Sequence, residues 1–171
     1  MNRLKREYGA DLDWLLPYPG DLHLLKNVQP VLMRLYYHSG LRELAQKAGY
    51  KGCNLTSLET CSHFKPTHCF LLEAFESVYL HAIDKYLAAK HVEVPSVDHL
   101  LRFLADTASS KHTAKLQVSF VLSDLGNYIM VWLSLHSSNR LLQMGIFKLM
   151  ARLFHASGRE YYCTWNCLQC I

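Results

Sequence analysis

The sequence is poor in charged, β-branched and turn-forming residues. Charged residues make up 19% of the 171 residues, below the roughly 25% of ordinary soluble domains, whereas hydrophobic residues make up 50%. This balance excludes a disordered chain and predicts apolar surface that a partner covers. Nine Val and four Ile accompany 30 Leu, and Gly and Pro together number 13. Strand-rich domains need more β-branched and turn-forming residues than this, so we predict a mainly α protein.

The sequence also lacks the common signatures of secretion and catalysis. No apolar leader opens it, and it contains no glycine-rich phosphate loop, no G-x-S-x-G elbow and no H-E-x-x-H pair. We therefore expect free thiols and a location in the nucleus or cytoplasm. The net charge of +4 is small for a protein whose whole surface coats nucleic acid. Any weak nucleic-acid binding must then come from a local site.

Apolar residues at helical spacing predict a bundle of about six helices. The predicted helices cover residues 22–36, 41–48, 67–89, 96–107, 115–135 and 139–158. Residues 50–66 are expected to form a loop or short turns, in which Thr56-Ser57-Leu58-Glu59 could be a capping box. Thr67 and Asn139 are expected as N-caps, and Gly49 as a left-handed C-terminal cap. Pro30 should kink or break the first helix. The stretch 115–135 is apolar nearly all round and long enough to raise the question of a membrane span, but polar residues such as Asp124 interrupt it, so we expect no membrane contact.

The two ends of the chain are expected to differ from the bundle. Residues 1–13 show no sustained period and predict a frayed lead-in, residues 14–158 a single helical domain, and residues 159–171 a cysteine-containing tail. Pro17 and Pro19 exclude a helix within the apolar run that starts at Trp14, which makes this run the strand candidate. We therefore expect one short extended segment ahead of the helices.

Asp21 and His23 are the first candidate site residues, because they stand where this extended segment turns into a helix. A carboxylate at the end of a strand can hold a divalent metal, and the imidazole two residues later could assist it. Alternatively, the Asp21 side chain caps the helix by accepting a backbone N–H from its first turn. The two interpretations are compatible with each other.

Six cysteines fall in two groups, each with histidine nearby. The first set is Cys53, Cys61, His63, His68 and Cys69. The second set is His155, Cys163, Cys167 and Cys170. Each set could supply four zinc ligands, but the first lacks a C-x2-C pair and the second has the spacing of no familiar zinc finger. We expect loop packing for the first set and reactive thiols at a frayed end for the second. Zinc is the alternative at both, and folding should require no cofactor.

Three stretches of the chain together resemble a large family of animal proteins regarded as transposon-derived. The segment Tyr18 to Tyr50 contains P-G-D-L-H followed by a helix and then "GL", which is similar to the family's hallmark. The stretch Cys61 to Leu80 is similar to its next helix. The stretch from Ser138-Asn139 to Tyr162 is similar to its "GNW…KLMAPLF" segment, although Arg140 replaces the aromatic residue there.

The resemblance implies descent from transposases with an RNase H-like catalytic domain. Such enzymes hold two Mg²⁺ ions with three acidic residues, and several carry a helical insertion domain after the strand of the second acid. Asp21 would match that second acid and His23 the histidine that follows it, with a D-x-H instead of the commoner D-x-x-H spacing. The first acid and its strands would precede this chain, so we expect an incomplete active site.

Two functions follow as expectations. The first is a non-catalytic fragment of a transposase-like protein whose ancestral activity was DNA transposition with Mg²⁺, equivalent to the helical insertion domain. The alternative is a helical scaffold that binds a protein partner through its exposed apolar surface and has no role with nucleic acid. Salt dependence of DNA binding separates the two, because phosphate contacts necessarily weaken with salt.

Overall fold

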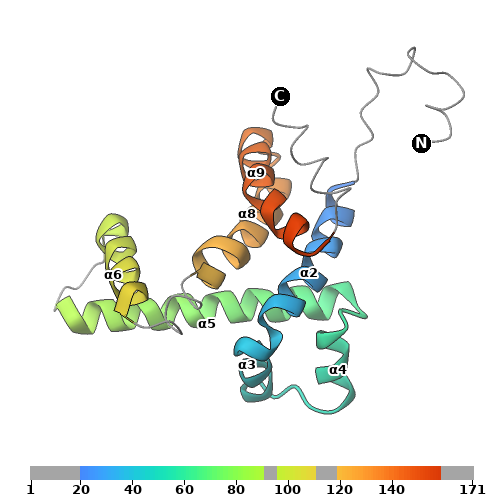
Figure 1. Cartoon of the computed structure of the whole chain (residues 1–171), viewed down its shortest axis with the longest axis horizontal. Coiled ribbons are helices and arrows are strands. Elements are labelled where there is room, and N and C mark those ends of the chain that lie inside the picture. The colour runs from blue at the N-terminus through green and yellow to red at the C-terminus, as the bar shows by residue number, and fades with distance from the viewer. Residues whose placement is uncertain (1–19, 91–95, 111–118, 159–171) are drawn as a thin grey trace, which may run out of the picture.

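A computed structural model describes residues 20–90, 96–110 and 119–158 (Figure 1). The predicted lead-in, the extended segment at 14–19 and the cysteine tail at 159–171 lie outside these ranges. The elements in chain order are α2 (Asp21–Tyr36), η2 (Tyr37–Ser39), α3 (Leu41–Lys47), α4 (Cys53–Glu59), α5 (Phe64–Lys90), α6 (Val97–Ser110), η3 (Ser119–Leu125), α8 (Gly126–His136) and α9 (Arg140–Ala156).

The prediction of a mainly α bundle is confirmed, since the described residues contain seven α-helices and no strand. Helix α2 is central and packs against α4, α5, α8 and α9. Its apolar residues recur at steps of three and four, so that one face, including Leu24, Val28 and Leu32, is almost wholly removed from solvent. Tyr128 of α8 and Phe154 of α9 complete this main core and are fully buried.

The start of α2 differs from the predicted cap. Gly20 occupies the N-cap position, with φ −49° and ψ 144°, and its carbonyl accepts hydrogen bonds from the amides of His23 and Leu24 at 2.8 and 3.0 Å. Asp21 is the first helical residue, so its prediction as the N-cap is wrong. An acidic residue in the first turn still interacts favourably with the helix dipole. The helix continues through Pro30 to Tyr36, and the alternative of a break at that proline is wrong as well.

The predicted cap of α3 is confirmed. Gly49 follows the helix with φ +93°, a conformation that glycine adopts without the steric penalty of a side chain. Its amide donates to the Gln46 carbonyl at 3.1 Å, and the amide of Tyr50 donates to the Ala45 carbonyl at 3.0 Å. These two bonds satisfy carbonyls that the end of a helix would otherwise leave unpaired.

The predicted loop at 50–66 and the predicted start of α5 both need correction. Residues Cys53–Glu59 form the short helix α4, and α5 begins at Phe64, ahead of Thr67. Thr67 is buried in the first turns of α5 and donates its hydroxyl to the His63 carbonyl at 3.0 Å, so it is not an N-cap. Pro66 favoured a helix start after it in the sequence prediction. Proline is nevertheless tolerated in the first turn of a helix, because the amides there have no helical partner.

Helix α5 belongs to two hydrophobic cores. Its N-terminal half enters the main core through Phe70, Leu71 and Ala74. Its C-terminal part packs against α6 around a separate small core centred on Tyr86, Leu100 and Leu104. We call residues 79–90 together with α6 the arm. The arm extends to one side of the molecule, away from α9 (Figure 1).

The last described elements form a hairpin. A π-helical segment, Ser119–Leu125, leads into α8, where the sequence predicts one regular helix. A turn then connects α8 to α9, and these two helices pack along each other. The prediction of Asn139 as the N-cap of α9 is confirmed, because its Oδ1 accepts the Leu142 amide at 3.0 Å. Within the described ranges, no helix is both long and apolar enough to cross a membrane.

Candidate interaction surface

A buried polar network joins α2, α5 and α8 in the middle of the core. The Gln29 Nε2 atom donates to the Tyr128 hydroxyl at 2.9 Å and to the Phe64 carbonyl at 3.2 Å. The same hydroxyl lies 2.7 Å from Nδ1 of His68. Gln29 and Tyr128 are fully buried, so these bonds replace water contacts that the Gln29 Nε2 atom and the Tyr128 hydroxyl lost on folding, while Gln29 Oε1 is buried without a partner. The network fixes the position of α8 relative to α2 and α5.

The surroundings of His68 favour the neutral form of its ring. The Tyr128 oxygen accepts from Gln29, and its hydroxyl can donate its proton to an unprotonated Nδ1 of a neutral His68. Burial lowers the pKa of His68, and the nearby His136 lowers it further. Burial also raises the pKa of Tyr128, so that the hydroxyl keeps its proton. The neutral pair is thus a structural link between helices.

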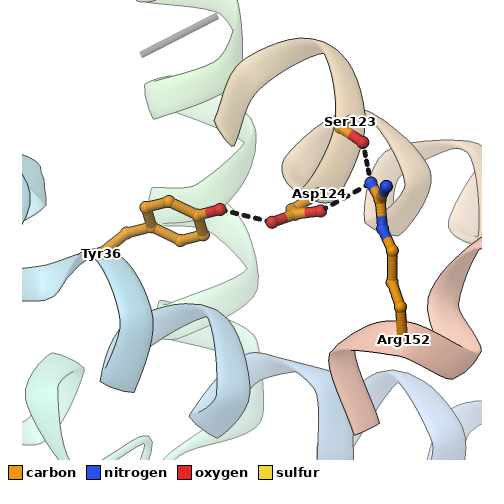
Figure 2. A network of polar contacts seen from close by, with 4 residues as sticks. All are labelled: Tyr36, Ser123, Asp124 and Arg152. Carbon is orange, nitrogen blue, oxygen red and sulfur yellow. Dashed lines mark hydrogen bonds and ion pairs between the residues drawn. The ribbon is translucent and has the colours of Figure 1, made fainter. Parts of the chain in front are cut away.

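A second network attaches α9 to the bundle (Figure 2). Asp124, in the π-helical segment, accepts a hydrogen bond from the Tyr36 hydroxyl and forms an ion pair with Arg152 at 3.2 Å. Arg152 also donates to the Ser123 hydroxyl. Burial and the hydrogen bond to Asp124 raise the pKa of Tyr36. The Asp124 side chain is only 8% exposed while that of Arg152 is 58% exposed, so the pair holds α9 in place yet leaves the guanidinium at the surface.

Helix α9 exposes a surface that is both apolar and positively charged. We call it the α9 face, and it consists of Arg140, Leu141, Met144, Lys148, Leu149 and Arg152. At 100° per residue these six side chains fall on one half of the helix, while the other half is buried. Leu141 is 85% exposed and Leu149 53% exposed, which is unusual for two large apolar side chains on one helix face.

Two features of α9 shape this face. No acidic residue occurs between Asp124 and Glu160, so nothing on α9 itself offsets its cations. Gly145 lies in the centre of the face, and a Cβ placed there would meet no atom within 4 Å. A glycine inside a helix costs roughly 1 kcal/mol relative to alanine. Here it leaves a notch between the exposed side chains on either side.

The predicted catalytic pair is not part of the α9 face. Asp21 and His23 both lie in the first turn of α2, and His23 is exposed. Their assignment as relics of an active site stays a prediction. An open groove of about 240 Å³ lies elsewhere, between α3 and α5, and Lys47 and Glu73 are the charged residues that line it.

The structure separates the residues of the first cysteine and histidine set. Cys53 is exposed in α4, whereas His68 belongs to the buried network of the core, where its ring stacks on that of Phe64. Cys61 and Cys69 are partly buried, and the Cys61 thiol donates to the Leu58 carbonyl at 3.6 Å. In the part of the chain that the structure describes, no three His, Cys, Asp or Glu side chains form a group suited to one metal ion. Of the second set, His155 is exposed on α9, and the three cysteines lie outside the described residues.

Comparison with protein-family models, with curated proteins and with solved structures finds no match to this chain. The class of protein therefore follows from the fold, a mainly α helical bundle, and from its surface. The α9 face was not predicted from the sequence, because the apolar period of residues 139–158 marks only the side of the helix that enters the core. Two signals could have revealed it: the absence of acidic residues after Asp124, and leucines on the same side of the helix as Lys148 and Arg152.

Proposed function

We propose that this chain is a non-catalytic helical interaction module that binds an acidic, amphipathic protein surface through its α9 face. The observation that carries the proposal is the joint exposure of Leu141 and Leu149 beside Lys148 and Arg152. A soluble helix that needed only to cover its own core would place polar residues at the leucine positions. Exposed apolar residues that charged residues border are typical of a protein-binding site.

The internal networks support this assignment, because they make the face rigid. Asp124 fixes Arg152, and the Asn139 cap fixes the first turn of α9. A surface that is held in place before binding loses less conformational entropy on association. An amphipathic helix with acidic residues beside its apolar stripe is the partner that complements such a surface.

Nucleic-acid binding is the second candidate, and the run of cations on α9 favours it. Arg140, Lys148 and Arg152 project from one helix that carries no acid, as the phosphate-binding surface of a transposase-derived helical domain would. The exposed leucines between these cations are left without a role by this alternative. For that reason we place it second.

Fluorescence anisotropy with two labelled ligands tests both candidates. The first ligand is a synthetic helical peptide in which glutamates flank a leucine by one turn on each side, and the second is a DNA duplex. We expect the peptide to bind the wild type, and the variants Leu141→Ser and Leu149→Ser to bind it about tenfold or more weakly, since each loses a buried leucine. Leu22→Ser is the matched control, because Leu22 is 63% exposed on α2.

The outcomes separate the candidates. Absence of peptide binding, or an equal loss in Leu22→Ser, would contradict the protein-binding proposal. Binding to the duplex that weakens steeply with salt and is unaffected by Leu141→Ser would support the nucleic-acid alternative instead.

A further inference from the structure

Helix α5 carries a stripe whose chemistry is the reverse of that of the α9 face. Leu80 of α5 is 59% exposed, and one turn to either side along the same line of the helix stand Glu76 and Asp84, both exposed. Side chains four residues apart lie one above the other on a helix. The surface of α5 therefore presents an apolar side chain between two carboxylates, and we call it the Leu80 stripe.

The spacing of the Leu80 stripe matches that of the α9 face. Residues 141, 144, 145 and 148 have the i, i+3, i+4, i+7 arrangement that forms a hole for one side chain of a facing helix, and Gly145 leaves this hole open. Arg140 and Lys148 stand about one turn to either side of its centre, eight residues apart. Glu76 and Asp84 are also eight residues apart, so that both pairs span about 12 Å along their helices.

We infer that the partner of the α9 face is a second copy of this chain, whose Leu80 enters the hole at Gly145 while Glu76 and Asp84 pair with Arg140 and Lys148. This inference rests on the proposed function and names its partner. Within one chain the two surfaces do not cover each other, because Leu80 and Leu141 are both exposed. Each copy has one stripe and one face, so a reciprocal exchange of both contacts closes a symmetric dimer.

Charge reversal tests the inference in sedimentation-velocity experiments. The first variant, Glu76→Lys with Asp84→Lys, places lysines opposite the cations of the partner's face. The second, Arg140→Glu with Lys148→Glu, places glutamates opposite the partner's acids. We expect the wild type to dimerise, and each double variant alone to associate on the order of 100-fold more weakly, because like charges then meet at both contacts.

Mixing the two variants should restore the dimer. In the mixed dimer the lysine stripe of the first variant meets the glutamate face of the second, and the two unchanged surfaces meet each other. Restoration also shows that both variants are folded. Glu43→Lys on α3 is the control and should leave the dimer unchanged.

A monomeric wild type, variants that still dimerise, or a mixture that stays monomeric would each overturn the inference. The result remains distinguishable from a failure of the proposed function. If the wild type is monomeric but binds the acidic peptide through Leu141, the dimer inference is wrong while the proposed interaction module still holds.

Discussion

Replacing Tyr128 by phenylalanine removes a single oxygen from the centre of the core and tests the network that places α8. The Tyr128 hydroxyl accepts a hydrogen bond from Gln29 and lies 2.7 Å from His68. Phenylalanine keeps the ring and its packing. Gln29 then loses one acceptor and the His68 nitrogen loses its hydrogen-bond partner, and both side chains are largely removed from solvent.

The expected loss in the free energy of unfolding follows from these two orphaned groups. A buried polar group without a partner costs about 1–3 kcal/mol. His68 retains 8% exposure and Gln29 still donates to the Phe64 carbonyl, so each group should cost an amount in the lower part of this range. We expect the two together to cost about 2–4 kcal/mol. For a chain of this size that corresponds to a decrease in Tm of roughly 4–16 °C.

Urea denaturation followed by circular dichroism measures this loss. Tyr79→Phe, which removes a hydroxyl from a half-buried ring stacked on Phe75, is the control and should cost about 0.5 kcal/mol or less. His68→Phe combined with Tyr128→Phe should cost less than the sum of the single changes, because the two groups share one bond. A cost below about 0.5 kcal/mol for Tyr128→Phe alone would refute the network as a link between helices.

Four further predictions concern stability. The folded-state pKa of His68 lies below its unfolded value of 6.5, so the unfolded chain binds the proton first as the pH falls. The free energy of unfolding should therefore stay constant above pH 6.5 and decrease as the pH drops below it. His68→Phe should flatten this dependence in denaturation curves measured across pH. Arg152→Met leaves the buried Asp124 carboxylate without its cation and should cost about 1–3 kcal/mol in urea denaturation, whereas Asp124→Asn should cost less, because the half-exposed guanidinium can be hydrated. Asn139→Ala removes the cap of α9 and should lower the free energy of unfolding by about 0.5–2 kcal/mol, and an unchanged Tm would show that the cap is dispensable. Asp21→Ala should cost only about 0.3–1 kcal/mol, since Asp21 follows the N-cap position, and neither this variant nor the wild type should nick supercoiled DNA with Mg²⁺.

The helices could be predicted from the sequence wherever apolar period and cap chemistry agree. The cap of α9 at Asn139 and the end of α3 at Gly49 are examples, because an amide side chain and a glycine act there through local geometry alone. The start of α5 could not be predicted in the same way. Pro66 and Thr67 resemble a helix boundary, but the chain places both of them inside the first turns.

The candidate site was less accessible to prediction, because it depends on contacts between distant residues. His68 had the neighbours of a metal ligand in the sequence, yet its partner is Tyr128, 60 positions away. Likewise, Asp124 looked like part of a polar helix edge, and only the fold brings it to Tyr36 and Arg152. Helical period places the leucines of the α9 face on the same side as Lys148 and Arg152, but whether they stay exposed depends on what packs against that half of α9 in the fold.

The most direct test of the central claim is an NMR titration of the ¹⁵N-labelled chain with the acidic amphipathic peptide. The account predicts that the largest amide shifts fall on residues 140–152, the helical span of the α9 face, and that Leu141→Ser abolishes them at the same peptide concentration. Shifts confined to other helices, or none at a peptide excess, would contradict the claim that the α9 face is the binding surface of this protein.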